Sequence, residues 1–172
     1  MSILEDFLIV DGYNIINSWS ELAALKQQNF EHAREKLVDI LSDLQGVFKG
    51  RVIVVFDALN VKGGTEQRVL DGGIEIIYTQ EGETADACIE KLVGRLPAGS
   101  IIGVATSDWA EQRIIFGRGA HRLSARDLYE RVQEARIERE KYASTGVFEA
   151  NKLDSNIEDH VKDTLEKLRR SK

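Results

Sequence analysis

An aspartate and an asparagine follow the first apolar run of the chain at a spacing that suits ligand binding or catalysis. The run is Phe7-Leu8-Ile9-Val10, and the next four residues are Asp11-Gly12-Tyr13-Asn14. Four consecutive apolar residues are typical of a strand in a parallel sheet covered on both faces, and such sheets bind ligands beyond the carboxyl ends of their strands. Asp11 is therefore expected where a ligand would lie. For this motif alone, the alternative is a helix-capping turn without chemistry.

Two further apolar runs end close to an acid. The run over 52–56 is followed by Asp57, and the run over 101–105 is followed three residues later by Asp108. Alternation of these runs with helical patterns predicts parallel, neighbouring strands. The three carboxylates are therefore expected to converge at one edge of a sheet.

A fourth carboxylate comes from a predicted helix. Asp86 lies three residues before Ile89, on the apolar stripe of a helix that starts at about residue 83 and ends before Pro97. We therefore expect Asp86 to point inward from the first turn, where the helix dipole favours a negative charge. Carboxylates that share a cleft raise one another's pKa unless a cation neutralises them. The cluster of Asp11, Asp57, Asp86 and Asp108 therefore predicts a bound divalent cation.

The ligand types indicate which ion would bind. Carboxylate oxygens suit Mg²⁺ or Mn²⁺, which keep several waters and commonly bind phosphate. A zinc site of the usual nitrogen and sulfur kind lacks ligands, because Cys88 is the only cysteine and the three histidines do not have the spacing of a zinc motif. Cys88 itself is interpreted as a small buried hydrophobic residue.

Composition is that of one globular domain. The chain has 172 residues, 42% of them hydrophobic, a formal net charge of -6, and no apolar run of membrane-spanning length. One cysteine excludes an internal disulfide, and the start of the sequence has no basic region of a secretion signal, so a cytoplasmic location is expected. The net charge argues against a surface that coats nucleic acid. Basic residues nevertheless concentrate after Asp108, where residues 112–126 hold four arginines and no acid.

Strand and helix patterns alternate along the chain. Helices are predicted at about 20–26, 30–48, 83–96, 109–116, 124–142 and 156–169, and strands at 7–10, 51–56, 74–78, 101–105 and 120–123. The loop over 58–73 is long and is predicted to be a mobile flap. This order predicts an α/β fold with three layers, in which helices flank a central, mostly parallel sheet.

Four blocks of the sequence, in this order, resemble the YacP-like branch of the NYN-domain nucleases, which share the PIN-type fold. The blocks are Ile9–Asn14, Val54–Ala58, Glu83–Asp86 and the segment from Val104–Asp108 through Ser124–Leu128. The match runs from about Phe7 to Arg139, so we expect an NYN domain over 1–143 and a linker with a C-terminal helix over 144–172. The resemblance implies a metal-dependent endoribonuclease associated with the ribosome, which cuts messenger RNA in the ribosomal A site.

The resemblance also implies roles for individual residues. Asp11, Asn14, Asp86 and Asp108 match active-site positions, with Asp57 as a further member. With Mg²⁺ or Mn²⁺ held by Asp11, Asp86 and Asp108, hydrolysis would leave a 5′-phosphate and a 3′-hydroxyl. The candidate RNA contacts are Tyr13, Thr106, Ser107, Arg113, Arg118, Arg122 and Arg126. Tyr13 and the arginines also have structural alternatives, which are packing under a loop for Tyr13 and solvating a helix for an arginine. No membrane partner and no nucleotide cofactor are expected.

Two other functions compete with nuclease activity. One is an RNA-binding or ribosome-binding module that keeps the fold with an idle site, although a buried acidic cluster without metal would lower stability. The other is a phosphoacceptor domain of the response-regulator kind, since Asp57 and Thr106 both follow strands. The chain lacks the paired acids after strand one that this second function needs.

The helix predicted over 156–169 carries an apolar stripe that must be covered. The stripe consists of Ile157, Val161, Leu165 and Leu168. It can dock on its own domain or on a partner, and docking on its own domain is favoured because an exposed stripe promotes association.

Overall fold

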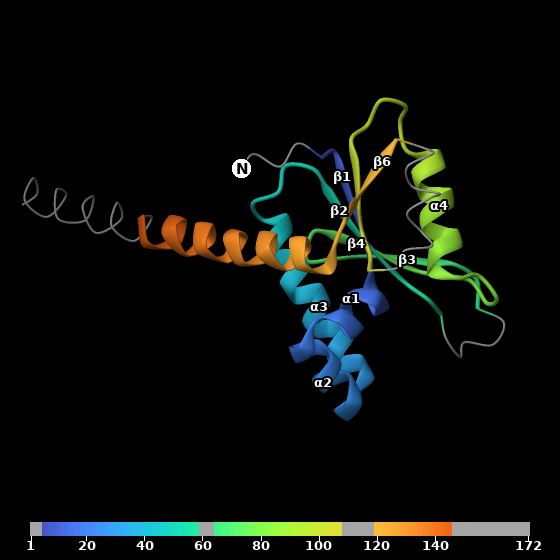
Figure 1. Ribbon diagram of the computed structural model, residues 1–172, viewed down its shortest axis with the longest axis horizontal. Coiled ribbons are helices and arrows are strands. Elements are labelled where there is room, and N and C mark those ends of the chain that lie inside the picture. The colour runs from blue at the N-terminus through green and yellow to red at the C-terminus, as the bar shows by residue number, and fades with distance from the viewer. Residues whose placement is uncertain (1–4, 59–63, 108–118, 146–172) are drawn as a thin grey trace, which may run out of the picture. The chain divides into compact units, whose positions relative to one another are not determined.

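The computed structural model describes residues 5–58, 64–107 and 119–145. Its elements alternate between strand and helix along most of the chain (Figure 1). The strands are β1 (Phe7–Asp11), β2 (Arg51–Phe56), β3 (Gln67–Asp71), β4 (Ile74–Tyr78), β5 (Ile102–Ala105) and β6 (Ala120–Leu123). The helices are α1 (Gly12–Ser18), α2 (Ser20–Gln28), α3 (Phe30–Gln45) and α4 (Ala85–Arg95), followed by a helix over 125–145 that is orange in Figure 1.

The six strands form one sheet in the order β3-β4-β2-β1-β5-β6. Only the pair of β3 and β4 is antiparallel, and the other four pairs are parallel. β1 lies in the middle, with Val10 in register with Val54 of β2 and with Ala105 of β5. The segments that follow β1, β2 and β5 therefore leave the sheet side by side, as the sequence predicts.

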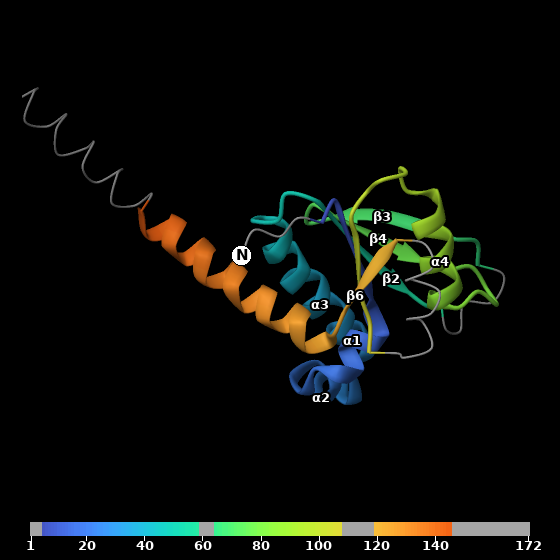
Figure 2. The same cartoon turned by 45° about the horizontal axis from the view of Figure 1, so that its top comes forward.

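Side chains of successive strand residues point to opposite faces of the sheet, and each face is covered. Leu8 and Val10 belong to a core with α1, α2 and α3, whereas Ile9 belongs to a second core with α4. Figure 2 shows α4 and the group α1 to α3 on opposite sides of the strands. The predicted α/β fold with helices flanking a mostly parallel sheet is confirmed.

Caps explain where two of the long helices start. The side-chain oxygen of Asn29 accepts hydrogen bonds from the backbone N–H groups of Glu31 and His32 at the start of α3. Thr84 accepts from the N–H of Ala87 at the start of α4. Both caps satisfy N–H groups that have no partner inside the helix.

The predicted loop over 58–73 is wrong in part, because β3 forms its second half. β3 is exposed at every residue and pairs with β4 through a hairpin at Gly72 and Gly73, both with positive φ. Its sequence, Gln-Arg-Val-Leu-Asp, lacks the apolar face that reveals a buried strand. Helix α1 was also not predicted, and it begins directly after β1. Residues 59–63 of the loop lie outside the described part.

The chain divides into a compact unit over 1–135 and a second unit over 136–172. Of the second unit, residues 136–145 are described, and they are helical. The predicted helices at 109–116 and 156–169 lie outside the described residues, so the apolar stripe of the latter stays a prediction. Among the described residues, the structure contains no helix with the length and apolarity that crossing a bilayer requires.

Candidate active site

Asp11 forms the tip of the central strand and also caps the helix that follows. Its side chain is 6% exposed, and Oδ1 accepts a hydrogen bond of 3.4 Å from the N–H of Asn14. The chain turns directly from strand to helix because Gly12 packs against Phe56, where any Cβ would overlap the aromatic ring. The helix-capping turn and the candidate site are therefore the same structure, and capping does not exclude chemistry.

Asn14 connects two strand ends that are distant in the sequence. Its Oδ1 accepts hydrogen bonds from the backbone N–H of Ser107 at 2.6 Å and from the Ser107 hydroxyl at 2.7 Å. Ser107 Oγ also accepts a bond of 3.2 Å from Ser18 in α1. The residue after Ser107 is Asp108, which lies outside the described residues, as do Arg113 and Arg118. Asn14 thus fixes the segment that leads to Asp108, and the ligand role of Asp108 stays a prediction.

Asp57 extends from the end of β2, beside the end of β1. The fully buried Thr79 holds this segment, because its backbone N–H donates to the carbonyl of Phe56 and its hydroxyl accepts from the N–H of Ala58, both at 3.0 Å. Asp57 is partly exposed and lines a cavity. It is therefore accessible to a ligand at the carboxyl edge of the sheet.

Asp86 lies in the first turn of α4 but is exposed, so the expectation that it points inward is wrong. The apolar stripe of α4 consists of Ala85, Cys88, Ile89, Leu92 and Val93 instead. Because α4 follows the parallel strand β4, its first turn lies at the carboxyl edge of the sheet. Strand alternation puts Asp11 on the same side as Ile9, which packs in the core with α4. Asp11 and Asp86 therefore share an edge and a face of the sheet.

Thr106 is buried with no exposed surface, and its carbonyl accepts a hydrogen bond of 3.1 Å from Nε of Arg122. Its backbone N–H donates to the carbonyl of Leu123 at 3.1 Å. In this conformation the Thr106 hydroxyl is closed to a phosphate in solution. Arg122 joins the end of β6 to the end of β5, which is a structural contact in addition to any role with RNA.

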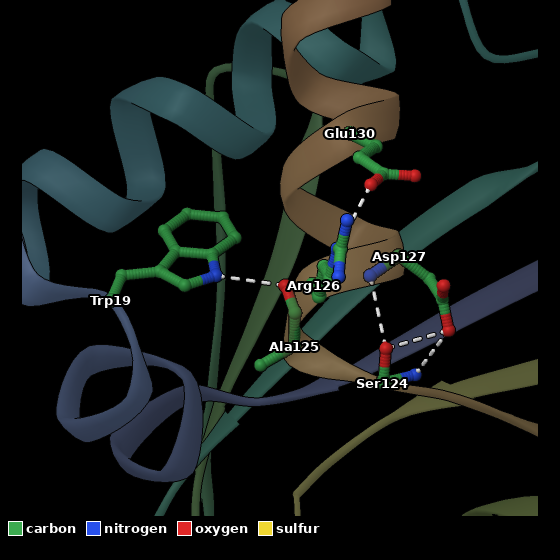
Figure 3. A network of polar contacts seen from close by, with 6 residues as sticks. All are labelled: Trp19, Ser124, Ala125, Arg126, Asp127 and Glu130. Atoms are coloured by element: carbon green, nitrogen blue, oxygen red, sulfur yellow. Dashed lines mark hydrogen bonds and ion pairs between the residues drawn. The ribbon is translucent and has the colours of Figure 1, made fainter.

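Arg126 lies on the surface at the start of the helix over 125–145 (Figure 3). Its Nε pairs with Glu130 at 3.1 Å, one helical turn further on, and its side chain is 87% exposed. Glu130 is thus the acidic partner of Arg126 in the structure. An exposed pair of this kind stabilises little and leaves the guanidinium accessible.

The start of this helix is fixed to the segment that joins α1 and α2 (Figure 3). Ser124 and Asp127 bond to each other reciprocally, through contacts of 2.6 to 3.0 Å. These bonds from Ser124 hold the pKa of the Asp127 carboxyl below its usual value. The indole N–H of Trp19 donates to the carbonyl of Ala125 at 2.9 Å. The segment after β6 is therefore held by both a cap and a long-range bond.

A cavity of about 650 Å³ opens next to Asp57. It is lined by Tyr13, Phe30, Arg34 and Tyr78 among others, and of these only Tyr13 was predicted as a site residue. Burial raises the pKa of the Tyr13 hydroxyl, in agreement with packing under neighbouring side chains. One signal could have revealed two of the others. Phe30 and Arg34 are four residues apart on a predicted helix and therefore share a face.

The described residues contain one group of three side chains with metal-ligand atoms within 4.8 Å of one another, namely Glu66, Glu83 and Cys88. Glu83 pairs with Lys91, and Glu66 pairs with Arg68 at 2.9 Å. Burial, together with the negative charges of Glu83 and Glu66, raises the pKa of the Cys88 thiol to about 11. A neutral thiol and carboxylates that already have cationic partners indicate a structural cluster, in agreement with the interpretation of Cys88 as a hydrophobic residue.

The donors at the carboxyl edge of the sheet are of the type that a hard divalent cation prefers, but the carboxylates of the described residues Asp11, Asp57 and Asp86 do not form a group within 4.8 Å of one another. Asp11, Asp57 and Asp86 all offer carboxylate oxygens, and Asn14 offers a carboxamide that already holds Ser107. Oxygen ligands of this kind suit Mg²⁺ or Mn²⁺. Nitrogen or sulfur ligands are not among these donors.

Comparison with known proteins shows the family to which the chain belongs. The YacP-like NYN domain family matches residues 8–170. This chain belongs to that family. NYN domains have a nuclease-type fold, and the match extends further than the sequence blocks suggest, through most of the segment after Lys141.

Three comparisons show how far the similarity reaches. The chain is 45% identical over 168 residues to the uncharacterized protein YacP of Bacillus subtilis (strain 168), covering 96% of this chain and 97% of the relative. A crystal structure of Rae1 (YacP) from Bacillus subtilis is 43% identical, with a TM-score of 0.69 over 96% of this chain and 95% of that one. A second crystal structure, of a mutant Rae1 in which leucine replaces a tryptophan, is 44% identical, with a TM-score of 0.67, covering 81% of this chain and 83% of that one.

Proposed function

We propose that this YacP-like NYN protein is a metal-dependent endoribonuclease. The observation that carries the proposal is the position of Asp11, a buried carboxylate at the carboxyl end of the central strand. Asp57 follows the neighbouring strand, and Asp86 begins the helix that covers the same face. Carboxylates gathered at this edge of a nuclease-type fold are suited to a hydrolytic reaction on a phosphodiester.

Asp11, Asp86 and Asp108 are the proposed ligands of Mg²⁺ or Mn²⁺. Such an ion, when bound, lowers the pKa of a coordinated water and neutralises charge on the scissile phosphate. The contribution of the protein itself is to hold the ends of neighbouring strands side by side. Asn14 holds the backbone and hydroxyl of Ser107, so the end of β5 stays beside the end of β1. Asp57 is available to orient a substrate group or a water beside the site.

The narrower form of the proposal is cleavage of messenger RNA on the ribosome, in the A site. It follows from the resemblance to the YacP-like branch rather than from a particular contact. Arg126 supports an RNA partner because its guanidinium is exposed near the end of the sheet that carries the acids. Arg122, which is partly buried, supports it less.

A cleavage assay with and without divalent ions tests the proposal. The protein is incubated with labelled single-stranded RNA, and separately with translating ribosomes, in the presence of Mg²⁺, Mn²⁺ or EDTA. We expect cleavage with either ion, none in EDTA, and products with a 5′-phosphate and a 3′-hydroxyl. Cleavage only on ribosomes would support the narrower form.

Two results would contradict the proposal. Cleavage that persists in EDTA would show that the reaction does not require a divalent ion. Binding of RNA or ribosomes without cleavage under every condition would assign the protein to the alternative class, a noncatalytic binding module. Asp39→Asn, which changes an exposed aspartate on α3, is the matched control for substitutions of the site aspartates.

A further inference from the structure

The cavity next to Asp57 has the size and the lining of a ligand site. Its volume of about 650 Å³ lies within the range of small-molecule pockets, which is about 300 to 1,000 Å³. All of its lining residues belong to the unit over 1–135. α1, α3, β4 and the segment after β2 each contribute side chains, so the pocket is built from elements that the core holds in place.

Four aromatic rings pack together at this pocket. Tyr13 lies between Phe30 and Phe56, with centroid distances of 4.9 and 5.2 Å, and Phe56 stacks on Tyr78 at 5.9 Å. Of these rings, Tyr13, Phe30 and Tyr78 line the open cavity. Rings in such a group offer flat surfaces on which a planar ligand can stack.

Arg34 places a cation among the rings. Its guanidinium carbon is 5.7 Å from the ring centroid of Phe30 and 5.5 Å from that of Tyr78. One terminal nitrogen pairs with Glu31, and the other donates to the Tyr13 hydroxyl at 3.5 Å. Within the described residues, the buried Nε of Arg34 has no hydrogen-bond partner. The pocket therefore presents a positive charge and a planar guanidinium, with Asp57 and Glu31 as acceptors on its walls.

The lining discriminates between classes of ligand. A quaternary ammonium ligand would be repelled by Arg34, which already lies against the ring faces. A phosphate would lie near the carboxylates of Asp57 and Glu31. A purely apolar ligand would leave these three charged groups without solvent. A planar, neutral ring with hydrogen-bonding groups on its edge satisfies all of these constraints, and nucleobases have this chemistry.

The pocket also lies next to the candidate active site. Tyr13 is two residues after Asp11, and Asp57 belongs to both the pocket and the carboxyl edge. Gly12, between Asp11 and Tyr13 in the chain, packs on the ring of Phe56. We propose that this pocket binds one unstacked nucleobase of the RNA and thereby sets the position of the neighbouring phosphodiester at the carboxylates. The inference rests on the proposed endoribonuclease function and adds to it a subsite for the base.

Binding of short RNA in EDTA tests the subsite without cleavage. The probe is a single-stranded RNA tetranucleotide that contains 2-aminopurine, whose fluorescence falls when it stacks on an aromatic ring. The comparison ligand is an abasic tetranucleotide with the same sugar-phosphate backbone and charge. Because stacking on a base is worth about 1 to 3 kcal/mol, we expect the abasic ligand to bind at least about fivefold more weakly.

Variants of the lining residues then test whether the base stacks in this pocket. Tyr78→Leu and Tyr13→Leu remove a ring while keeping apolar volume, and each should lower the affinity for the base-containing RNA about tenfold and restore 2-aminopurine fluorescence. Tyr129→Leu is the matched control, because Tyr129 is 46% exposed and packs on Trp19 outside the pocket. It should bind as the wild type does.

A crosslinking experiment tests the subsite on the wild-type protein, so its result does not depend on whether the variants fold. RNA with 4-thiouridine is irradiated on the wild-type protein, and the modified peptide is identified by mass spectrometry. A crosslink on Tyr13, Phe30 or Tyr78 supports the subsite. Equal binding of the abasic ligand, or crosslinks confined to residues outside the pocket, would overturn it. Cleavage is measured separately with Mg²⁺, so base binding without cleavage contradicts the nuclease function alone, and cleavage without base binding contradicts the subsite alone.

Discussion

At the scale of single residues, Asp11 combines a structural contact with a negative charge. Its side chain caps α1 through the N–H of Asn14, and this contact needs an oxygen acceptor but no charge. A metal ligand, in contrast, needs the carboxylate. The two roles can therefore be separated by substitution.

We expect Asp11→Asn to abolish cleavage while leaving the melting temperature unchanged or higher. Asparagine keeps the capping oxygen, and the loss of one negative charge relieves repulsion among the clustered carboxylates. Asp11→Ala should abolish cleavage as well, but it also removes the cap and should lower stability by about 1 kcal/mol. Calorimetry and the cleavage assay are carried out on the same preparations. Near wild-type activity of Asp11→Asn would exclude Asp11 as a ligand.

Glu5 forms a buried ion pair that makes stability depend on pH. Its Oε1 lies 2.9 Å from Arg131 and 2.8 Å from His121, and its side chain is 5% exposed. Burial raises the pKa of the Glu5 carboxyl, but the hydrogen bonds from Arg131, from the backbone and from His121 outweigh burial and hold it below 4.5. His121 is thus a strand-edge residue with a structural partner.

A lowered pKa in the folded state means that the stabilisation by Glu5 is present above pH 4.5 and is lost as the pH falls through the folded value. Glu5→Gln should therefore lower the free energy of unfolding by about 2 kcal/mol near neutral pH. The difference from the wild type should shrink when urea unfolding is repeated under acidic conditions. A difference that stays constant with pH would mean that packing, rather than charge, is lost.

At the scale of elements, the turn from β1 into α1 depends on close packing. A side chain at Gly12 would overlap Phe56, whose ring is fully buried. Gly12→Ala should therefore lower stability by about 1 to 3 kcal/mol through overpacking. Phe56→Leu makes space at this contact, so the double variant should lose less than the sum of the two single variants, as measured by urea unfolding. Strict additivity would show that the two residues do not compete for space.

The buried strands could be predicted from the sequence, because β1, β2 and β5 consist mainly of continuous apolar runs and β4 holds three isoleucines interrupted only by Glu75. β3 could not, since both of its faces are exposed and its pairing with β4 depends on the hairpin at Gly72 and Gly73. The parallel order that gathers the strand ends was also predictable from alternation.

The candidate site was predictable only in part. Asp11 and Asp57 were identified because they follow apolar runs. The orientation of Asp86 was not, because a residue in the first turn can lie at the margin of an apolar stripe and still face solvent. The pocket around Arg34 and Tyr78 joins elements that are distant in the sequence, and no local pattern encodes such a contact.

At the scale of the whole molecule, the net charge of -6 makes the binding of RNA depend on local positive charge. Arg126→Ala should lower the slope of log K against log salt by about one unit if this arginine contacts a phosphate. Arg136→Ala, in the second unit, is the comparison variant. Titration of RNA at several ionic strengths measures the slope for each variant. An unchanged slope for Arg126→Ala would mean that Arg126 contacts no phosphate and only pairs with Glu130.

Truncation after Thr145 tests the segment that lies outside the described residues. The family match reaches residue 170, so the segment is part of the domain that relatives share. If its predicted helix docks on its own domain, the truncated protein should melt several degrees lower, since about 1 kcal/mol shifts the midpoint by about 2 to 4 °C at this size. An unchanged melting temperature with lost ribosome association would assign the helix to a partner.

The hydrogen bonds between Asn14 and Ser107 join residues that are 93 positions apart in the chain. During synthesis, the first half of the candidate site is therefore made well before the second. At about 5 to 20 residues per second, the delay is roughly 5 to 20 s. β1 can pair with β2 in this interval, but its other edge stays open until β5 has been made. The candidate site therefore cannot form until the end of β5 and Ser107 have been made, and until then Asn14 lacks its partner.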